Sequence, residues 1–115
     1  LVVTAGKNFV ASRMKDTTLA AMSHMALGTN NTEALVGQTA LSAEVTRGAL
    51  TSTTVSTNTI AYVETFAAGT GTGAIVEAGI FNASSAGSML CRTVFDVVNK
   101  SSLDAMTVTW TITVS

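Results

Sequence analysis

The chain has 115 residues, the length of one domain, which we expect to span residues 1–115 and to bury a stable core without disulfide bonds. Six Lys and Arg residues against seven Asp and Glu residues give a net charge of -1, which excludes the basic field of a nucleic-acid-binding protein. Cys91 is the only cysteine and His24 the only histidine, so an internal disulfide and a multi-cysteine zinc site are also excluded. No apolar run reaches the about 18 residues of a membrane span, and we expect a soluble chain with no membrane partner.

The surface of this chain must be poor in charge. Charged residues make up 11% of the sequence and hydrophobic residues 47%, and the mean hydropathy is +0.44. Ser and Thr must supply much of the polar surface, and the β-branched Thr favours strands. The chain has no Pro to protect the edges of a sheet. We therefore expect neighbouring subunits to cover these edges, in a homo-oligomer or a crowded assembly.

The N-terminal part of the chain predicts one short helix among strands. Residues 1–5 have the composition of a short strand, and residues 7–15 place their apolar side chains at helical spacing. Residues 20–27 alternate as a strand does, and residues 32–38 have no clean period and predict a surface loop. Residues 39–47 again show the two-residue period of a strand, although a helical turn at the start of this segment is also possible.

The rest of the chain reads as strands separated by turn-forming residues. Gly48 is expected to interrupt or bulge the chain before a Thr-rich strand at residues 49–55. Residues 59–66 carry apolar side chains on both faces, so this strand is expected to lie centrally. Residues 73–81 and 88–99 predict two further strands, joined by a turn rich in Asn, Ser and Gly.

The last strand, at residues 105–115, has the clearest pattern in the chain. Its even-numbered positions from 106 to 114 are large and apolar, and four of the residues between them are Thr. This alternation predicts a half-buried antiparallel strand, and we expect Trp110 to anchor the core. Seven or eight such strands with one short N-terminal helix predict an all-β fold, a single antiparallel β-sandwich of jelly-roll-like type.

The glycine-rich stretch Gly69-Thr70-Gly71-Thr72-Gly73 does not predict a phosphate site. It lacks the Lys-Ser/Thr ending of a phosphate-binding loop and precedes a strand, so a flexible hairpin connection is expected. His24 has no nucleophile in sequence reach and is interpreted as a structural or interface residue, and Cys91 as a buried small hydrophobe. We predict no catalytic residue, no metal ion and no cofactor.

Glu77 is the one residue whose predicted surroundings require a partner for its side chain. It lies among apolar residues of a predicted buried strand, where a carboxylate without a partner is unfavourable by several kcal/mol. Arg47 and Arg92 are possible partners, and Arg92 is the nearer across the predicted turn. We expect Glu77 and Arg92 to form a structural ion pair rather than an acid/base site, because acid/base work would need a second carboxylate close by.

Three short segments carry a resemblance to a known family. They are Met25-Ala26-Leu27-Gly28-Thr29, then Gln38-Thr39-Ala40-Leu41 leading to Glu44 and Arg47, then Gly73-Ala74-Ile75-Val76-Glu77-Ala78-Gly79-Ile80-Phe81-Asn82. In this order they resemble small virion proteins of tailed bacteriophages and are similar to the N-terminal tail-collar domain of phage tail fibres. We refer to residues 25–29, 38–47 and 73–82 as the three motif segments.

The resemblance implies a non-enzymatic structural protein of the virion, assembled in the cytoplasm of the bacterial host. The sequence ends directly after its last predicted strand, with no shaft or receptor-binding tip. We therefore expect a small capsid decoration or cement protein that binds the major capsid protein. The alternative is a tail-collar or fibre-attachment component that binds tail proteins. In both cases other copies of the chain are expected as partners, and nucleic acid is not.

A carbohydrate-binding β-sandwich is a distant alternative. Such sites need exposed aromatic rings beside polar groups, and only Tyr62 and Trp110 could supply large amphipathic rings. Both lie on faces predicted to be buried, which argues against this class. Partner contacts are expected instead in two loops, at Thr29, Asn30, Asn31 and Thr32 and at Gly69, Thr70, Gly71 and Thr72.

Overall fold

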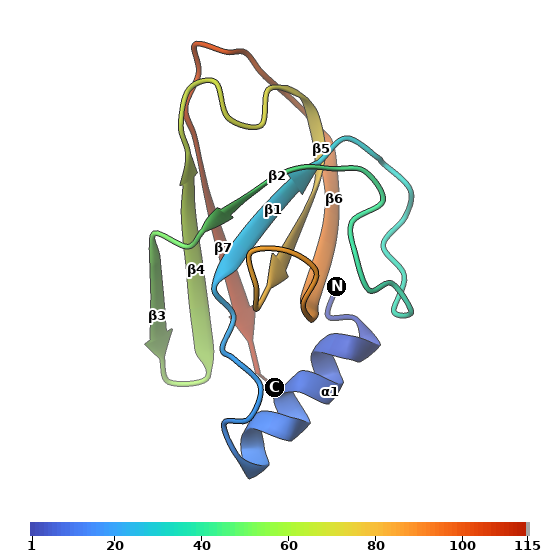
Figure 1. Cartoon of the computed structure of the whole chain (residues 1–115), viewed down its shortest axis with the longest axis vertical. Helices are drawn as coiled ribbons and strands as arrows, with labels where there is room; N and C mark the ends of the chain where they lie inside the picture. The colour runs from blue at the N-terminus through green and yellow to red at the C-terminus, as the bar shows by residue number, and fades with distance from the viewer. Residues whose placement is uncertain (115) are drawn as a thin grey trace.

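The computed structural model describes residues 1–114, which form one helix and seven strands (Figure 1). In chain order these are α1 (Thr4–Lys15), β1 (His24–Gly28), β2 (Glu44–Ala49), β3 (Ser52–Ser56), β4 (Thr59–Phe66), β5 (Gly73–Phe81), β6 (Met89–Lys100) and β7 (Met106–Thr113). A four-stranded sheet has the order β2-β1-β5-β6, and a three-stranded sheet has the order β3-β4-β7. All strand pairs are antiparallel and the two sheets pack together, which confirms the predicted all-β sandwich.

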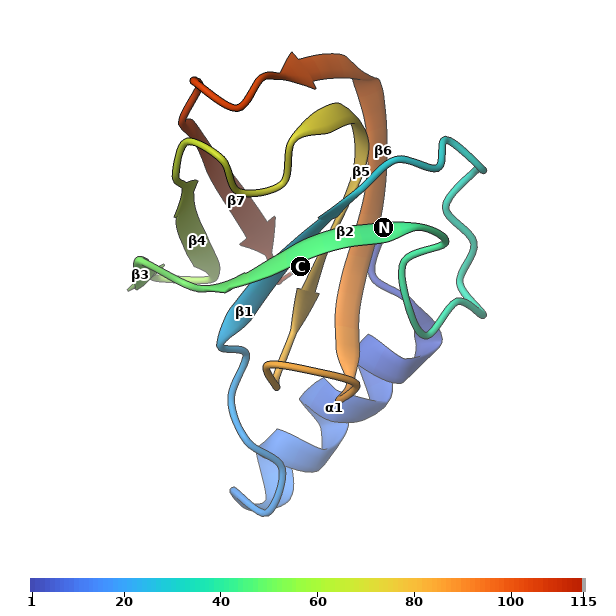
Figure 2. The ribbon, with the colours of Figure 1, turned by 45° about the horizontal axis from the view of Figure 1, so that its top comes forward.

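The chain changes sheet three times, between β2 and β3, between β4 and β5, and between β6 and β7 (Figure 2). The loop at residues 69–73 therefore joins the two sheets. The expectation of a hairpin connection at this loop is wrong. Its glycines allow the change of direction, because Gly69, Gly71 and Gly73 have φ angles of 84°, 66° and 139°. True hairpins join β3 to β4 and β5 to β6.

The main core lies between the two sheets. Its buried members are Phe9, Met22, Met25, Leu27, Tyr62, Phe66, Ile75, Ala78, Ile80, Leu90 and Cys91. The apolar side chains of β7 only pack against its margin, so Trp110 is half-buried and the expectation that it anchors the core is wrong. The reason is that β7 is the last strand of its sheet and has a neighbour only on the β4 side.

A second apolar cluster lies apart from this core, and it consists of Val3, Ala26, Leu41, Phe81 and Met89. Because side chains alternate along β5, Phe81 points to the face opposite that of Ile80. The central strands β1 and β5 are thus buried on both faces over most of their length. The N-terminal segment and the segment between β1 and β2 cover the outer face, with Val3 and Leu41. Leu41 is buried from this connecting segment, so the strand expected at residues 39–47 begins only at Glu44.

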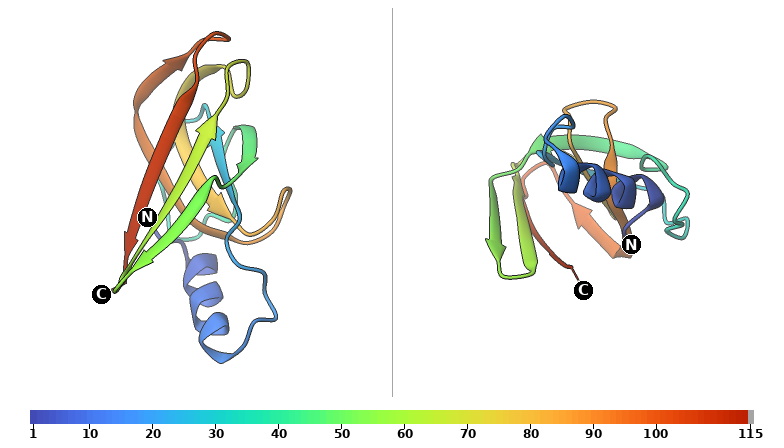
Figure 3. Two further views of the ribbon diagram at one scale, coloured as in Figure 1. Left: turned by 90° about the vertical axis from the view of Figure 1, so that its left-hand side faces the viewer. Right: turned by 90° about the horizontal axis from the view of Figure 1, so that it is seen from below.

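The N-terminal segment differs from the prediction of a strand at residues 1–5. Val2 alone forms a bridge, to Cys91, and α1 begins at Thr4 (Figure 3). Gly6 allows the helix to lie directly on β6, because a Cβ atom at this position would overlap the Leu90 carbonyl group. α1 is the one helix of residues 1–114, and it is not long and apolar enough to cross a membrane.

Two further strand boundaries differ from the sequence pattern. Residues 20–23 are not in a strand, and β1 begins at His24. Gly48 does not interrupt the chain but pairs with Met25 inside β2, and the next strand begins only at Ser52. Glycine suits this position of the strand, because a Cβ atom there would be 3.1 Å from Glu64 Oε2, which projects from β4 of the other sheet.

Candidate functional site

The carboxylate of Glu77, on β5, binds the backbone of two other segments. Its Oε2 accepts hydrogen bonds from the N–H groups of Asn30, at 3.1 Å, and Ala43, at 2.9 Å. Its Oε1 accepts a third, from the N–H group of Ser42, at 3.0 Å. The side chain of Glu77 is fully buried, so these bonds replace the water that it lost on folding.

The ion-pair partner of Glu77 is Arg92, on β6. Nε and Nη2 of Arg92 each lie 3.0 Å from Glu77 Oε1, and the side chain of Arg92 is also fully buried. The remaining donors of the guanidinium group bind the Thr32 carbonyl at 2.8 Å, the Asn30 carbonyl at 3.3 Å and Gln38 Oε1 at 3.2 Å. The structure thus contains the pair expected from the sequence, with Arg92 and not Arg47 as the partner.

We call Glu77, Arg92 and the groups that they bind the clamp. It attaches the segment between β1 and β2 to the outer face of the four-stranded sheet at residues 30, 32, 38, 42 and 43. Both oxygens of the carboxylate and all three nitrogens of the guanidinium group are engaged, so neither side chain has a free group for proton transfer to a substrate. The clamp is therefore a structural element.

Arg47 forms a second contact of this kind, which sequence reasoning missed. Its guanidinium group pairs with Glu44 through Nη2–Oε1 at 2.7 Å and Nε–Oε2 at 3.0 Å, and it lies 3.7 Å from the centre of the Phe81 ring. Nη1 donates to the carbonyl groups of Ala83, at 3.1 Å, and Ala86, at 2.8 Å. Arg47 thus holds the turn between β5 and β6. The only signal in the sequence was its spacing from Glu44 in the second motif segment.

The three motif segments pack on one another. Leu41 of the second segment lies over Gly79 of the third, where a Cβ atom would be 2.9 Å from Leu41 Cδ2. Gly28 of the first segment leaves room for the Glu77 carboxylate of the third. Together with the contact of Arg47 with Phe81, these contacts make the motif residues one packing unit on the outer face of the four-stranded sheet.

The two loops expected to contact partners lie at the same end of the sandwich (Figure 1). A Cβ atom on Gly73 would be 3.9 Å from Thr29 Cγ2, so the glycine-rich loop is adjacent to the start of the other loop. Thr29, Asn31, Thr32, Gly69, Thr70 and Thr72 are exposed, Asn30 is half-buried, and Gly71 is buried. Gly71 is held against Thr46, whose Cγ2 would be 2.7 Å from an added Cβ atom.

The connection between β6 and β7 belongs to the same end. Lys100 is buried, and its Nζ donates to the carbonyl groups of Ala67, at 2.9 Å, and Asp104, at 2.7 Å. This bond pair ties the two sheet-to-sheet connections together. Leu103 projects from the second of them and is 88% exposed. We refer to residues 29–32, 69–72 and 101–104 as the loop end.

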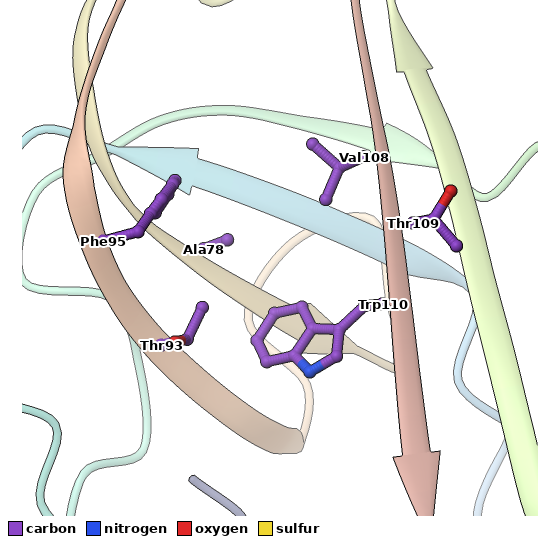
Figure 4. Close-up of a pocket in the computed structure, with 6 residues that line it drawn as sticks. All are labelled: Ala78, Thr93, Phe95, Val108, Thr109 and Trp110. Atoms are coloured by element: carbon purple, nitrogen blue, oxygen red, sulfur yellow. The ribbon is translucent and has the colours of Figure 1, made fainter.

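A small pocket of about 220 Å³ opens between the sheets beside Trp110 (Figure 4). It is lined by Ala78, Thr93, Phe95, Val108, Thr109 and Trp110. No Asn, Asp or other carboxylate or amide side chain is among these residues, and Tyr62 is buried. The carbohydrate-binding alternative required an aromatic ring flanked by such groups, and this pocket does not provide them.

The sequence offers one histidine, His24, and one cysteine, Cys91, for metal binding or nucleophilic chemistry. No group of three or more His, Cys, Asp and Glu residues in this part of the chain could hold a metal ion. The ring of His24 contacts the hydroxyl group of the preceding residue, with Nδ1 2.7 Å from Ser23 Oγ, so the expectation that His24 has no nucleophile in sequence reach is wrong. Burial raises the pKa of the Cys91 thiol to about 12, so its reactive thiolate form is suppressed at neutral pH.

Comparisons with known proteins identify no relative of this chain. Searches against protein-family models, curated proteins and solved structures found no match. Two features of the site can be interpreted from the residues themselves. The clamp and the Arg47 contacts fix the outer layer of the four-stranded sheet. The loop end presents mostly uncharged polar residues together with one exposed leucine, Leu103, and one exposed aspartate, Asp104. This arrangement suits contact with another protein.

Proposed function

We propose that this chain is a non-enzymatic structural protein of a tailed-bacteriophage virion that decorates or cements the capsid by protein–protein contacts. One observation carries the proposal: the residues that resemble the phage family contact one another in a packing unit. Glu77, Leu41 and Arg47 each bind or cover a residue of another motif segment or its flanks. The motif residues hold the fold together by contacting one another, and this supports a structural role.

The loop end supplies the surface for the proposed contacts. Its residues from 29 to 32 and from 69 to 72 carry no charge, and Leu103 presents an almost fully exposed apolar side chain. A large exposed apolar side chain suits a partner surface, because its burial there would remove apolar area from water. Its neighbours Ser101 and Ser102 are uncharged, and Asp104 is the one charged residue of the loop end. We assign the loop end to the contact with the major capsid protein.

The first test is to locate the protein in intact particles by cryo-electron microscopy. Capsid decoration predicts hundreds of copies on the head surface, a copy number on the order of the number of lattice positions. A few copies at the base of the tail would overturn decoration in favour of the tail-collar alternative. Absence from purified particles would overturn both.

The second test is a binding measurement with particles that lack the protein. Leu103→Asp is expected to abolish binding, because it places a charge in the proposed contact. Met14→Asp is a matched control, since Met14 is 84% exposed on α1 at the other end of the molecule (Figure 1). Equal binding by the two variants would show that the loop end is not the contact surface.

A further inference from the structure

The four edge strands of the two sheets are protected to very different degrees. An edge strand presents a row of backbone N–H and C=O groups that can pair with another chain. β6 is partly covered, because the N-terminal segment pairs with its first half: Val3 N–H donates to the Leu90 carbonyl at 3.2 Å, and Arg92 N–H donates to the Leu1 carbonyl at 2.9 Å. The second half of β6 has no such cover within residues 1–114.

Two other edges have features that oppose pairing. β2 carries the charged residues Glu44 and Arg47, and its pairing with β1 is irregular beside Gly28. β3 has only 5 residues. Charges, bulges and short length are the usual means by which an edge avoids another strand.

β7 has none of these features. It has 8 residues, MTVTWTIT, with no charged residue and no Pro. Its pairing with β4 runs from Thr113 to Met106 without a register shift, so its backbone is regular along the whole edge. A long, regular and uncharged edge is the kind that accepts another strand.

The inner face of β7 also leaves apolar surface exposed. Every second residue, from Met106 to Ile112, is only half-buried. Beside this strand lies the pocket of about 220 Å³, between Trp110 on β7 and Phe95 on β6 (Figure 4). On the uncovered half of β6, Val97 and Val98 are 53% and 42% exposed. A strand added to β7 would extend the three-stranded sheet over this pocket.

We propose that β7 pairs antiparallel with β7 of a second copy of the chain, which joins two three-stranded sheets into one continuous sheet across a two-fold axis. The strand is complementary to itself. With the axis at Trp110, Val108 lies opposite Ile112, and Thr109 lies opposite Thr111, so apolar residues face apolar residues and Thr faces Thr. No like charges meet, because the strand has none. The pairing does not depend on the proposed virion function.

The first measurement is the mass of the purified chain by sedimentation equilibrium over a wide range of concentrations. A dimer of the 11.7 kDa chain is expected. Trp110 is the only tryptophan and lies at the proposed seam, so its fluorescence emission is expected to shift to shorter wavelength as the dimer forms. A monomer at every concentration would overturn the proposal without the need for any variant.

The second measurement locates the seam. The double variant Thr109→Lys/Thr111→Lys places lysines opposite each other on the exposed outer face of β7 and is expected to abolish the dimer. The matched control is Ser52→Lys/Thr54→Lys on β3, because Ser52 and Thr109 both pair with Val63, and Thr54 and Thr111 both pair with Ala61. The control is expected to remain dimeric.

The two variants carry the same charges on opposite edges of one sheet, so circular dichroism and thermal melting should show equal retention of the fold. A β7 variant that stays dimeric overturns the proposal. So does a β3 variant that dissociates, because the seam would then lie at the other edge.

Discussion

Gly28 lies directly against the carboxylate of Glu77. A Cβ atom on Gly28 would contact Glu77 Oε2 and would be 2.6 Å from the Ala43 carbonyl oxygen. Both neighbours belong to the clamp, since Glu77 Oε2 accepts the hydrogen bond of Ala43 N–H. The first motif segment therefore needs glycine at this position because it leaves space for the clamp, and not because of a positive φ angle.

Gly28→Ala is expected to lower the free energy of unfolding by about 1 to 3 kcal/mol, the usual range for overpacking a filled site. The added methyl group meets a backbone carbonyl, which cannot move without displacing the clamp. Chemical denaturation measures the change. Gly37→Ala is the control, because nothing lies within 4 Å of a Cβ atom there. Its effect should stay within about 0.5 kcal/mol, and equal losses in the two variants would contradict the close contact at Gly28.

Arg47→Lys is expected to destabilise the protein by about 1 to 3 kcal/mol, although it conserves the charge. An ammonium group cannot reproduce the two-point contact with Glu44 or the flat contact with Phe81, at 3.7 Å from the ring centre. Arg13→Lys is the matched control, since Arg13 lies 6.0 Å from the Phe9 ring and makes one exposed hydrogen bond, to the Leu19 carbonyl. A loss no larger than that of Arg13→Lys would show that charge alone holds the turn.

The sequence predicted the strands best where both neighbours in the sheet bury their side chains. Residues 59–66 and 73–81 were predicted with the bounds that β4 and β5 have. The pattern at residues 39–47 predicts a strand, with a helical turn possible at its start, because Leu41, Ala43 and Val45 are two apart. These three residues do not share an environment. Leu41 is buried from the connecting segment, whereas Val45 is 43% exposed on β2. A residue that covers a sheet from outside gives the same apolar signal as one within a strand.

The clamp was only partly predictable for a related reason. A carboxylate among apolar residues requires a partner, and this requirement pointed to Arg92 from the sequence. The backbone N–H groups of Asn30, Ser42 and Ala43 that complete the site could not be predicted. Every residue except Pro has such a donor, so only the path of the chain decides which ones reach Glu77.

Cys91 is expected to react slowly with iodoacetamide in the folded protein. Burial raises its thiol pKa to about 12 from the ordinary value of 9.0. This shift reduces the thiolate fraction at pH 8 by a factor of about 10³. Mass spectrometry of the alkylated product measures the rate, and the unfolded chain in denaturant is the control. Rapid labelling under native conditions, at a rate near that of the control, would mean that β6 opens beside the N-terminal segment.

The coupling between Glu77 and Arg92 can be measured with Glu77→Gln, Arg92→Met and the double variant. Each single change is expected to destabilise the protein by about 3 to 5 kcal/mol, because it leaves a buried charge without its partner. The double variant should lose less than the sum, since it removes both charges together. Arg92→Met also removes the bonds to the carbonyl groups of Asn30 and Thr32, so it should loosen that loop, which amide hydrogen exchange of residues 30–38 detects. Additive losses would show that the two side chains stabilise the loop separately and do not act as a pair.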